Sequence, residues 1–250
     1  MIEASLAGQT VLIPRAKAQA EEMAEAVRMR GGNPFILPLL KIVPTADQFS
    51  AENLSEYDWI LFTSKNSVIH FFQLIGEKKL PSTLQVAAIG TKTKQALVNR
   101  GCNVTFVPSK FEAEAFVEEF LSLISNEVRI LFPKGNLARD VIPTALQEAG
   151  FTLHEMIVYE TKYNEDAKLP LIKALESGTI DIITFTSPST VKSFVDLLEG
   201  TNWRQWVKRC TIGCIGPTTE REARNYFTSI IMPQEYTIDA LLDCASSQMR

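Results

Sequence analysis

Small hydroxyl side chains gather where two apolar runs of the chain end, and the pattern occurs twice. Leu61-Phe62-Thr63-Ser64 returns in the second half as Thr184-Phe185-Thr186-Ser187, and a stretch with helical periodicity follows each. Backbone N–H groups and the positive end of the helix dipole favour anions at such a helix start. The simpler interpretation is helix capping, which needs one hydroxyl at each start. The surplus hydroxyls favour anion binding, and the predicted binding residues are Thr63, Ser64, Ser67, Ser187 and Ser189.

A second pair of matching segments has the same character. Ala88-Ile89-Gly90-Thr91 returns as Cys214-Ile215-Gly216-Pro217, and two threonines follow the second copy. Each segment again ends an apolar run and begins a helical one. The candidate anion-binding residues here are Gly90, Thr91, Gly216, Thr218 and Thr219.

Two basic residues occupy matching positions just after a strand. Arg15 follows Pro14 and Lys134 follows Pro133, and the prolines are 133 − 14 = 119 residues apart. A cation at the carboxyl end of a strand can pair with a ligand carboxylate. The alternative is a solvated charge on the first helical turn.

Tyr159 is singular, because its partner in the repeat is Leu40, at 159 − 40 = 119. A phenol facing a ligand can donate a proton or a hydrogen bond. The alternative is a tyrosine that only packs its ring. We take Tyr159 as the candidate catalytic residue.

These residues must be positioned by strands that alternate with helices. Such alternation predicts an α/β fold, here two similar doubly wound parallel-sheet domains, with ligands bound beyond the carboxyl ends of the strands. The apolar runs Val104–Val107 and Ser229–Met232 are each expected to add a strand.

One long duplication accounts for the repeat, since the offset drifts only to 216 − 90 = 126 at Gly216. Position alone allows two architectures. The halves could be consecutive domains divided near Asn126. Alternatively, residues 1–38 and 168–250 form one discontinuous domain and residues 45–162 the other, with 39–44 and 163–167 as linkers.

Composition excludes several classes of protein. The net charge of −4 provides no basic field for nucleic acid. The sequence has no dinucleotide fingerprint or P-loop and no apolar run long enough to span a membrane. Four cysteines without a CxxC pair and two histidines, His70 and His154, give little support to a metal site. We expect a cytoplasmic protein with reduced thiols and structural histidines, and see no secretory signal.

Taken in order, these motifs resemble those of the uroporphyrinogen-III synthase family over essentially the whole chain. The segments that carry the resemblance are Phe62–Val68, Ala88–Gly90, Val158–Thr161, Phe185–Ser189 and Ile215–Thr219. It departs at Ser67, where relatives often carry alanine. The resemblance implies the discontinuous architecture, with two domains joined by a two-stranded linker.

The resemblance also implies an activity, the cofactor-free cyclisation of the linear tetrapyrrole hydroxymethylbilane. Water leaves from ring A to give an azafulvene, ring D attacks to form a spiro intermediate, and reclosure inverts ring D. Tyr159 stands where the family has a tyrosine thought to assist loss of hydroxide, and Thr218 matches a cleft threonine of the family motif. A monomer is implied, with a possible transient contact with the preceding pathway enzyme.

Two other classes of function remain as alternatives. A two-lobed protein that binds a small anion without chemistry would use the same helix starts. A regulatory domain built from duplicated flavodoxin-like units is the second alternative. The singular Tyr159 argues against the first and the surplus hydroxyls against the second.

Overall fold

The computed structural model describes residues 5–45, 49, 51–76, 78–125 and 127–247. It divides into two compact units, Met1–Lys41 with Lys162–Arg250 (unit 1) and Ile42–Thr161 (unit 2). Asn126, the dividing point of the consecutive architecture, lies outside the described residues, as do the outer ends of the discontinuous domain at 1–4 and 248–250. We describe each unit by itself.

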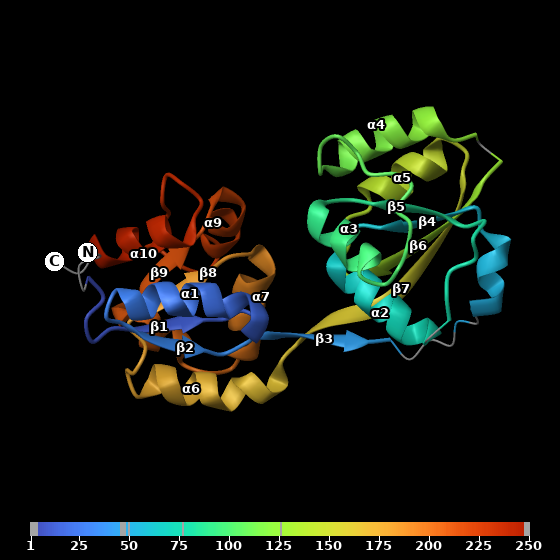
Figure 1. Cartoon of the computed structure of the whole chain (residues 1–250). Coiled ribbons are helices and arrows are strands. Elements are labelled where there is room, and N and C mark those ends of the chain that lie inside the picture. Colours follow the sequence, from blue (N-terminus) through green and yellow to red (C-terminus); the bar gives the residue numbers. More distant parts are fainter. Residues whose placement is uncertain (1–4, 46–48, 50, 77, 126, 248–250) are drawn as a thin grey trace. The chain divides into compact units, whose positions relative to one another are not determined.

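Unit 1 has a four-stranded parallel sheet in the order β2-β1-β8-β9, with helices on both faces (Figure 1). Its strands are β1 (Thr10–Ile13), β2 (Asn33–Ile36), β8 (Ile182–Phe185) and β9 (Thr211–Cys214). Its helices are α1 (Lys17–Met29), α6 (Lys168–Glu176), α7 (Pro188–Leu197), α8 (Trp203–Trp206), α9 (Pro217–Ala223) and α10 (Ile238–Ser247), with 3-10 turns η2 (Glu165–Ala167) and η3 (Val207–Arg209).

Unit 2 has a five-stranded sheet in the order β3-β7-β6-β4-β5. Its strands are β3 (Leu40–Pro44), β4 (Trp59–Phe62), β5 (Gln85–Ala88), β6 (Arg129–Gly135) and β7 (Thr152–Tyr163). Its helices are α2 (Lys65–Ile75), α3 (Thr91–Val98), α4 (Ala113–Leu123) and α5 (Val141–Glu148), with the 3-10 turn η1 (Ala51–Glu56). The two layers of helices follow in Figure 1, with α2 and α3 over one face of the sheet and α4 and α5 over the other.

The repeat is visible in the cores. The two matching strands β4 and β8 are buried along their whole length, as expected of strands covered on both faces. Phe62 meets Phe71 edge to face at 5.5 Å between ring centroids, and Phe185 meets Phe194 in the same way at 5.5 Å. The expected α/β fold is confirmed, with parallel pairing throughout unit 1 and among β7, β6, β4 and β5 of unit 2.

The two segments expected as linkers have different structures. Residues 39–44 contain β3, whereas of residues 163–167 only Tyr163 lies in β7 and Glu165–Ala167 form η2. The division between units falls inside β3 and inside β7. The Thr45 N–H donates to the Val158 carbonyl and the Asn164 N–H to the Leu39 carbonyl, so β3 runs antiparallel to β7. Leu39 is fully buried in the core of unit 1. Buried backbone groups must be hydrogen-bonded, and strand pairing satisfies them here.

Two predicted strands are not formed. In Val104–Val107 and Ser229–Met232, only Phe106 and Ile231 make an isolated parallel bridge, to Ala87 and Gly213. The side chains pack against the cores, but neither segment forms a ladder. Apolar composition predicts burial and cannot by itself predict ladder pairing.

Candidate active site

The helix that follows β4 in unit 2 begins with a cap made of two serines. Ser64 Oγ accepts a hydrogen bond from the Ser67 N–H at 3.0 Å, and Ser67 Oγ donates to the Ser64 carbonyl at 2.8 Å. Ser67 is fully buried. Its hydroxyl is satisfied inside the cap, so the Ser67 and Ser64 oxygens have a structural use whatever else they do.

The helix that follows β8 in unit 1 begins in the same way. Ser187 Oγ accepts from the Thr190 N–H at 3.3 Å and lies 3.0 Å from Ser189 Oγ. Thr190 Oγ1 donates to the Ser187 carbonyl at 2.7 Å. Proline at the first helical position, Pro188, suits a helix start because its missing N–H is not needed there.

The other two helix starts use glycine. Gly90 precedes α3 with φ +89°, a conformation that glycine adopts without steric cost. Gly216 precedes α9 in extended backbone with φ −168°, and the ring of Tyr236 lies against it. Thr91 and Thr218 are exposed, whereas Thr219 is 4% exposed and therefore buried.

A pocket of about 300 Å³ lies where β4, β6 and β7 end in unit 2. Three predicted site residues line it: Thr63, Ser64 and Tyr159. Ser67, Gly90, Thr91 and Lys134 are not among its lining residues. Five apolar side chains form much of the wall, namely Ile89, Phe111, Phe132, Leu137 and Ile142. The pocket therefore suits a ligand with an apolar body and a few polar groups.

The lining residues that sequence reasoning missed include Gly135, Arg139 and Thr161. Arg139 is the one cation among the described lining residues, and it is exposed. A guanidinium pairs well with a carboxylate. Its position in the short loop after an apolar strand is the signal that could have identified it.

Tyr159 lies between two structural neighbours. The imidazole of His70, on α2, is 5.3 Å from its ring between centroids. Nδ1 of His70 is buried without a hydrogen-bond partner among the described residues. The second neighbour is Gly135, on β6, whose backbone lies against the ring of Tyr159. His154 is placed elsewhere, hydrogen-bonded through Nδ1 to the phenol oxygen of Tyr57.

The positive charge of Lys134 is paired with two carboxylates of the protein. Its ammonium lies 2.5 Å from a Glu155 carboxylate oxygen and 3.2 Å from one of Asp140, and its side chain is 8% exposed. Burial opposes the charge, but these hydrogen bonds outweigh it and raise the pKa of Lys134. Two of the three ammonium donors are therefore used within the protein. Arg15, in unit 1, is half-buried just after β1.

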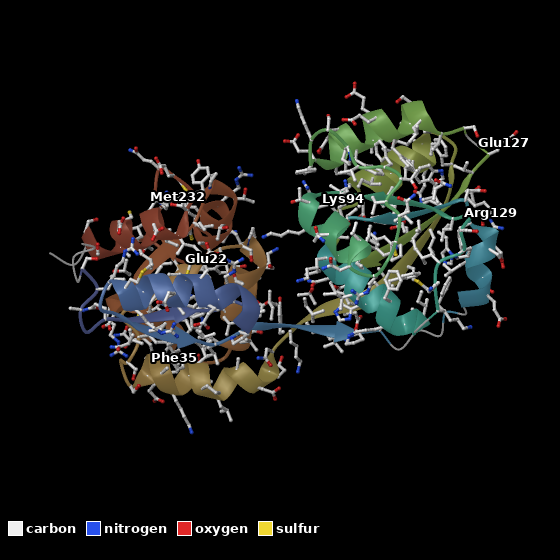
Figure 2. The ribbon with its side chains drawn as sticks, in the orientation of Figure 1. Glu22, Phe35, Lys94, Glu127, Arg129 and Met232 are labelled. Atoms are coloured by element: carbon white, nitrogen blue, oxygen red, sulfur yellow. The ribbon has the colours of Figure 1, made fainter. Side chains whose placement is uncertain are left out.

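A larger pocket of about 770 Å³ also lies in unit 2, lined by Phe72, Lys78, Lys79, Arg100 and Cys102 among others. It contains none of the predicted site residues and adjoins Gln85, where β5 begins. Ligands of parallel sheets bind beyond the carboxyl ends of the strands. We therefore assign the candidate site to the smaller pocket. Figure 2 marks the two ends of unit 2, with Lys94 on the first turn of α3 and Arg129 at the start of β6 on opposite sides of the unit.

No group of three or more histidine, cysteine, aspartate or glutamate side chains is placed to hold a metal ion in the described part of the chain. All four cysteines are free thiols. Burial raises the pKa of Cys210 to about 11 and that of Cys214 to about 12, so both stay protonated and unreactive at neutral pH. Among the described residues, no helix has the length and apolarity needed to cross a bilayer.

Comparison with solved structures supports the fold. The chain matches uroporphyrinogen-III synthetase from Helicobacter pylori with a TM-score of 0.61 at 18% identity, covering 96% of this chain and 99% of that one. It matches a mutant uroporphyrinogen III synthase from Thermus thermophilus with a TM-score of 0.60 at 17% identity, covering 97% and 100%.

Sequence comparison shows the family. The model for uroporphyrinogen-III synthase HemD matches residues 21–243. Uroporphyrinogen-III synthase from Synechococcus elongatus is 30% identical over 97% of this chain and 96% of its own. A putative uroporphyrinogen-III synthase from Methanocaldococcus jannaschii is 29% identical over 93% and 96%. The chain belongs to the uroporphyrinogen-III synthase family.

Proposed function

We propose that this protein is a uroporphyrinogen-III synthase, a lyase of tetrapyrrole biosynthesis. It closes hydroxymethylbilane with loss of water and inversion of ring D. The observation that carries the proposal is that Tyr159, Thr63 and Ser64 line one pocket at the carboxyl end of a family-type sheet. Hydroxymethylbilane combines pyrrole rings with carboxylate arms, which matches a wall of apolar side chains with hydroxyls and one guanidinium.

Within the proposal, the pocket takes one substituted pyrrole ring. Its volume of about 300 Å³ is at the small end of the range for ligand sites, roughly 300–1,000 Å³. In this proposal Arg139 and the hydroxyl of Thr63, which line the pocket, bind carboxylate arms by charge-assisted hydrogen bonds. The apolar wall excludes water from the ring, which favours capture of the azafulvene by ring D over capture by solvent.

Tyr159 is the proposed acid. Its phenol donates a proton or a hydrogen bond to the departing hydroxyl of ring A, which leaves as water. The ring D carbon that forms the final bond gives up its hydrogen as a proton, which restores the phenol. The overall loss is therefore one molecule of water, and no electron donor or acceptor is required.

The remaining predicted residues belong to the proposal as substrate contacts. In unit 2 these are Ser67, Gly90, Thr91 and Lys134, and in unit 1 they are Arg15, Ser187, Ser189, Gly216, Thr218 and Thr219. We also propose a cytoplasmic monomer that needs no cofactor or metal and touches the preceding pathway enzyme only transiently. The free thiols support a reducing compartment.

Isomer analysis tests the proposal. Purified protein is incubated with fresh hydroxymethylbilane, with and without a chelator, and the oxidised products are separated as type I and type III isomers. We expect mainly type III in both samples, against type I with heat-inactivated protein. Type I alone at the uncatalysed rate, with tight substrate binding, would favour a binding protein instead.

A further inference from the structure

The pairing of β6 with β7 shifts by one residue beside Tyr159. Lys134 is opposite Ile157, but Gly135 is opposite Tyr159, so Val158 has no partner residue on β6 and forms a β-bulge in this pairing. Successive side chains of a regular strand point to opposite faces. Here Val158 and Tyr159 both pack against the same core, because the bulge turns Tyr159 toward it. Bulges occur next to active sites, where they re-aim a side chain.

Gly135 provides the space that this orientation requires. A Cβ added at position 135 would lie 2.6 Å from Cε2 and 2.7 Å from the phenol oxygen of Tyr159. Both distances are far inside van der Waals contact, so the ring would have to move. Gly135 lies in β6 and is not among the glycines with positive φ. Space, not backbone conformation, is the reason for glycine here.

Asn136 forms hydrogen bonds with β7 on the C-terminal side of the bulge. Its N–H donates to the Tyr159 carbonyl at 3.2 Å. Its side-chain oxygen accepts from the Thr161 N–H at 2.8 Å, and its side-chain amide donates to the Thr161 carbonyl at 3.4 Å. The Asn136 side chain thus replaces a ladder partner for Thr161, and the backbone is held on both sides of Glu160.

We propose that Gly135 and Asn136 are positioning residues that hold the phenol of Tyr159 in the pocket. This rests on the proposed role of Tyr159 in the synthase reaction. Gly135 leaves room for the ring, Asn136 fixes the strand that carries it, and His70 packs beside it. Neither positioning residue needs to touch the reacting atoms.

The main test is Gly135→Ala, with Gly213→Ala in β9 as the matched control. At Gly213 an added Cβ would lie 3.0 Å from Cδ1 of Leu241, the flexible end of a side chain that can shift. We expect Gly135→Ala to lower kcat by roughly 10²- to 10⁴-fold, the range for loss of a positioned acid, with little change in KM. We expect Gly213→Ala to keep wild-type kcat.

A double variant distinguishes a positioning role of Gly135 from a general loss of structure. If Gly135 acts through Tyr159, the double variant Gly135→Ala with Tyr159→Phe loses no more activity than the more impaired single variant. Losses that multiply would overturn the proposal, as would a folded Gly135→Ala enzyme with wild-type kcat.

Asn136→Ala is the second variant, and it keeps Gly135 in case Gly135→Ala does not fold. Asn136 is exposed, so the substitution leaves the core intact. We expect a loss of about two- to tenfold in kcat, the effect of losing a hydrogen bond, and no further loss when Tyr159 is already phenylalanine. An unchanged kcat would show that Asn136 is not a positioning residue for Tyr159.

A readout independent of catalysis distinguishes failure of this inference from failure of the proposed function. The chain has five tyrosines, so fluorotyrosine labelling gives five ¹⁹F resonances, and Tyr159→Phe identifies one of them. That resonance should shift in Gly135→Ala and stay in place in Gly213→Ala. An unmoved resonance in Gly135→Ala would overturn the positioning role even if the protein makes the type III isomer.

Discussion

The helix starts after β4 and β8 are nearly the same structure in two different units. Ser64 has φ −151° and ψ 151°, and Ser187 has φ −156° and ψ 153°. In both, the cap oxygen accepts from the residue three positions later, whose own hydroxyl donates back to the cap carbonyl. What the duplication preserved is therefore a helix cap and the buried core beneath it.

The units differ beside that helix start. In unit 2, β6 runs as far as Gly135, whereas the matching strand of unit 1, β1, ends at Ile13. The repeat partner of Gly135 is Ala16, at 135 − 16 = 119, and that of Tyr159 is Leu40. Unit 1 thus has neither the glycine nor the phenol. The duplicated serine caps serve folding, and the proposed function assigns the acid to a position that diverged, Tyr159.

Among the variants that test this difference between the units, Tyr159→Phe should have the largest effect, a loss of activity. We expect the rate of type III formation to fall by roughly 10²- to 10⁴-fold, because the leaving hydroxyl loses its proposed proton donor. Tyr163→Phe is the matched control from the same strand, and it should keep the wild-type rate. Initial rates and isomer ratios measure both. Equal rates for the two variants would assign Tyr159 to packing.

Removing matching core rings should affect the two units equally but separately. Phe62 and Phe185 are fully buried, and Phe→Ala at such sites costs about 3–5 kcal/mol. Because each unit has its own core, we expect Phe62→Ala to shift only the unfolding of unit 2 and Phe185→Ala only that of unit 1. Denaturant unfolding followed by hydrogen exchange measures this. A single transition shifted alike by both variants would contradict independent units.

Loss of the matching caps should be smaller. Ser64→Ala and Ser187→Ala should each destabilise the protein by about 1 kcal/mol. If a hydroxyl also binds a substrate carboxylate, KM should rise as well, which separates capping from binding. Thermal unfolding and KM values of both variants measure the two effects. Thr201→Ala is a control, because its hydroxyl bonds only within a surface turn.

The smallest effect should come from pH, through Tyr163. Its phenol donates to Asp196 at 2.5 Å, and this bond, together with burial, raises the pKa of Tyr163 to about 12. An unfolded tyrosine titrates near pH 10. The folded pKa is the higher one, so the stabilisation is complete below pH 10 and is lost as the pH rises toward 12.

Tyr163 is 39% exposed, so solvent screening limits this contribution to below about 1 kcal/mol. The stability difference between wild type and Tyr163→Phe should shrink between pH 10 and 12. Absorbance titration of the phenols should lose its highest step in Tyr163→Phe. A highest step that survives the substitution would contradict this assignment.

Much of the fold could be predicted from local pattern. Val68, Phe71 and Ile75 lie on one helical face, and all three are buried. The caps form at Ser64 and Ser187, within the hydroxyl-rich segments where helix starts were expected. These features depend on neighbours along the chain, where periodicity and side-chain hydrogen bonding act directly. The same reasoning was wrong for ladder strands at Val104–Val107 and Ser229–Met232, since pairing depends on a distant strand.

The sequence by itself determined the duplication, the helix starts, the family and the singular position of Tyr159. Only the tertiary structure decided what surrounds them. It buried Ser67 against the Ser64 cap, paired Lys134 with Glu155 and Asp140, and brought Arg139 to the pocket. It also placed the bulge that brings Tyr159 over Gly135. The physical reason is range, because a cap is decided within four residues, whereas strand register and ion pairs depend on segments that only folding brings together.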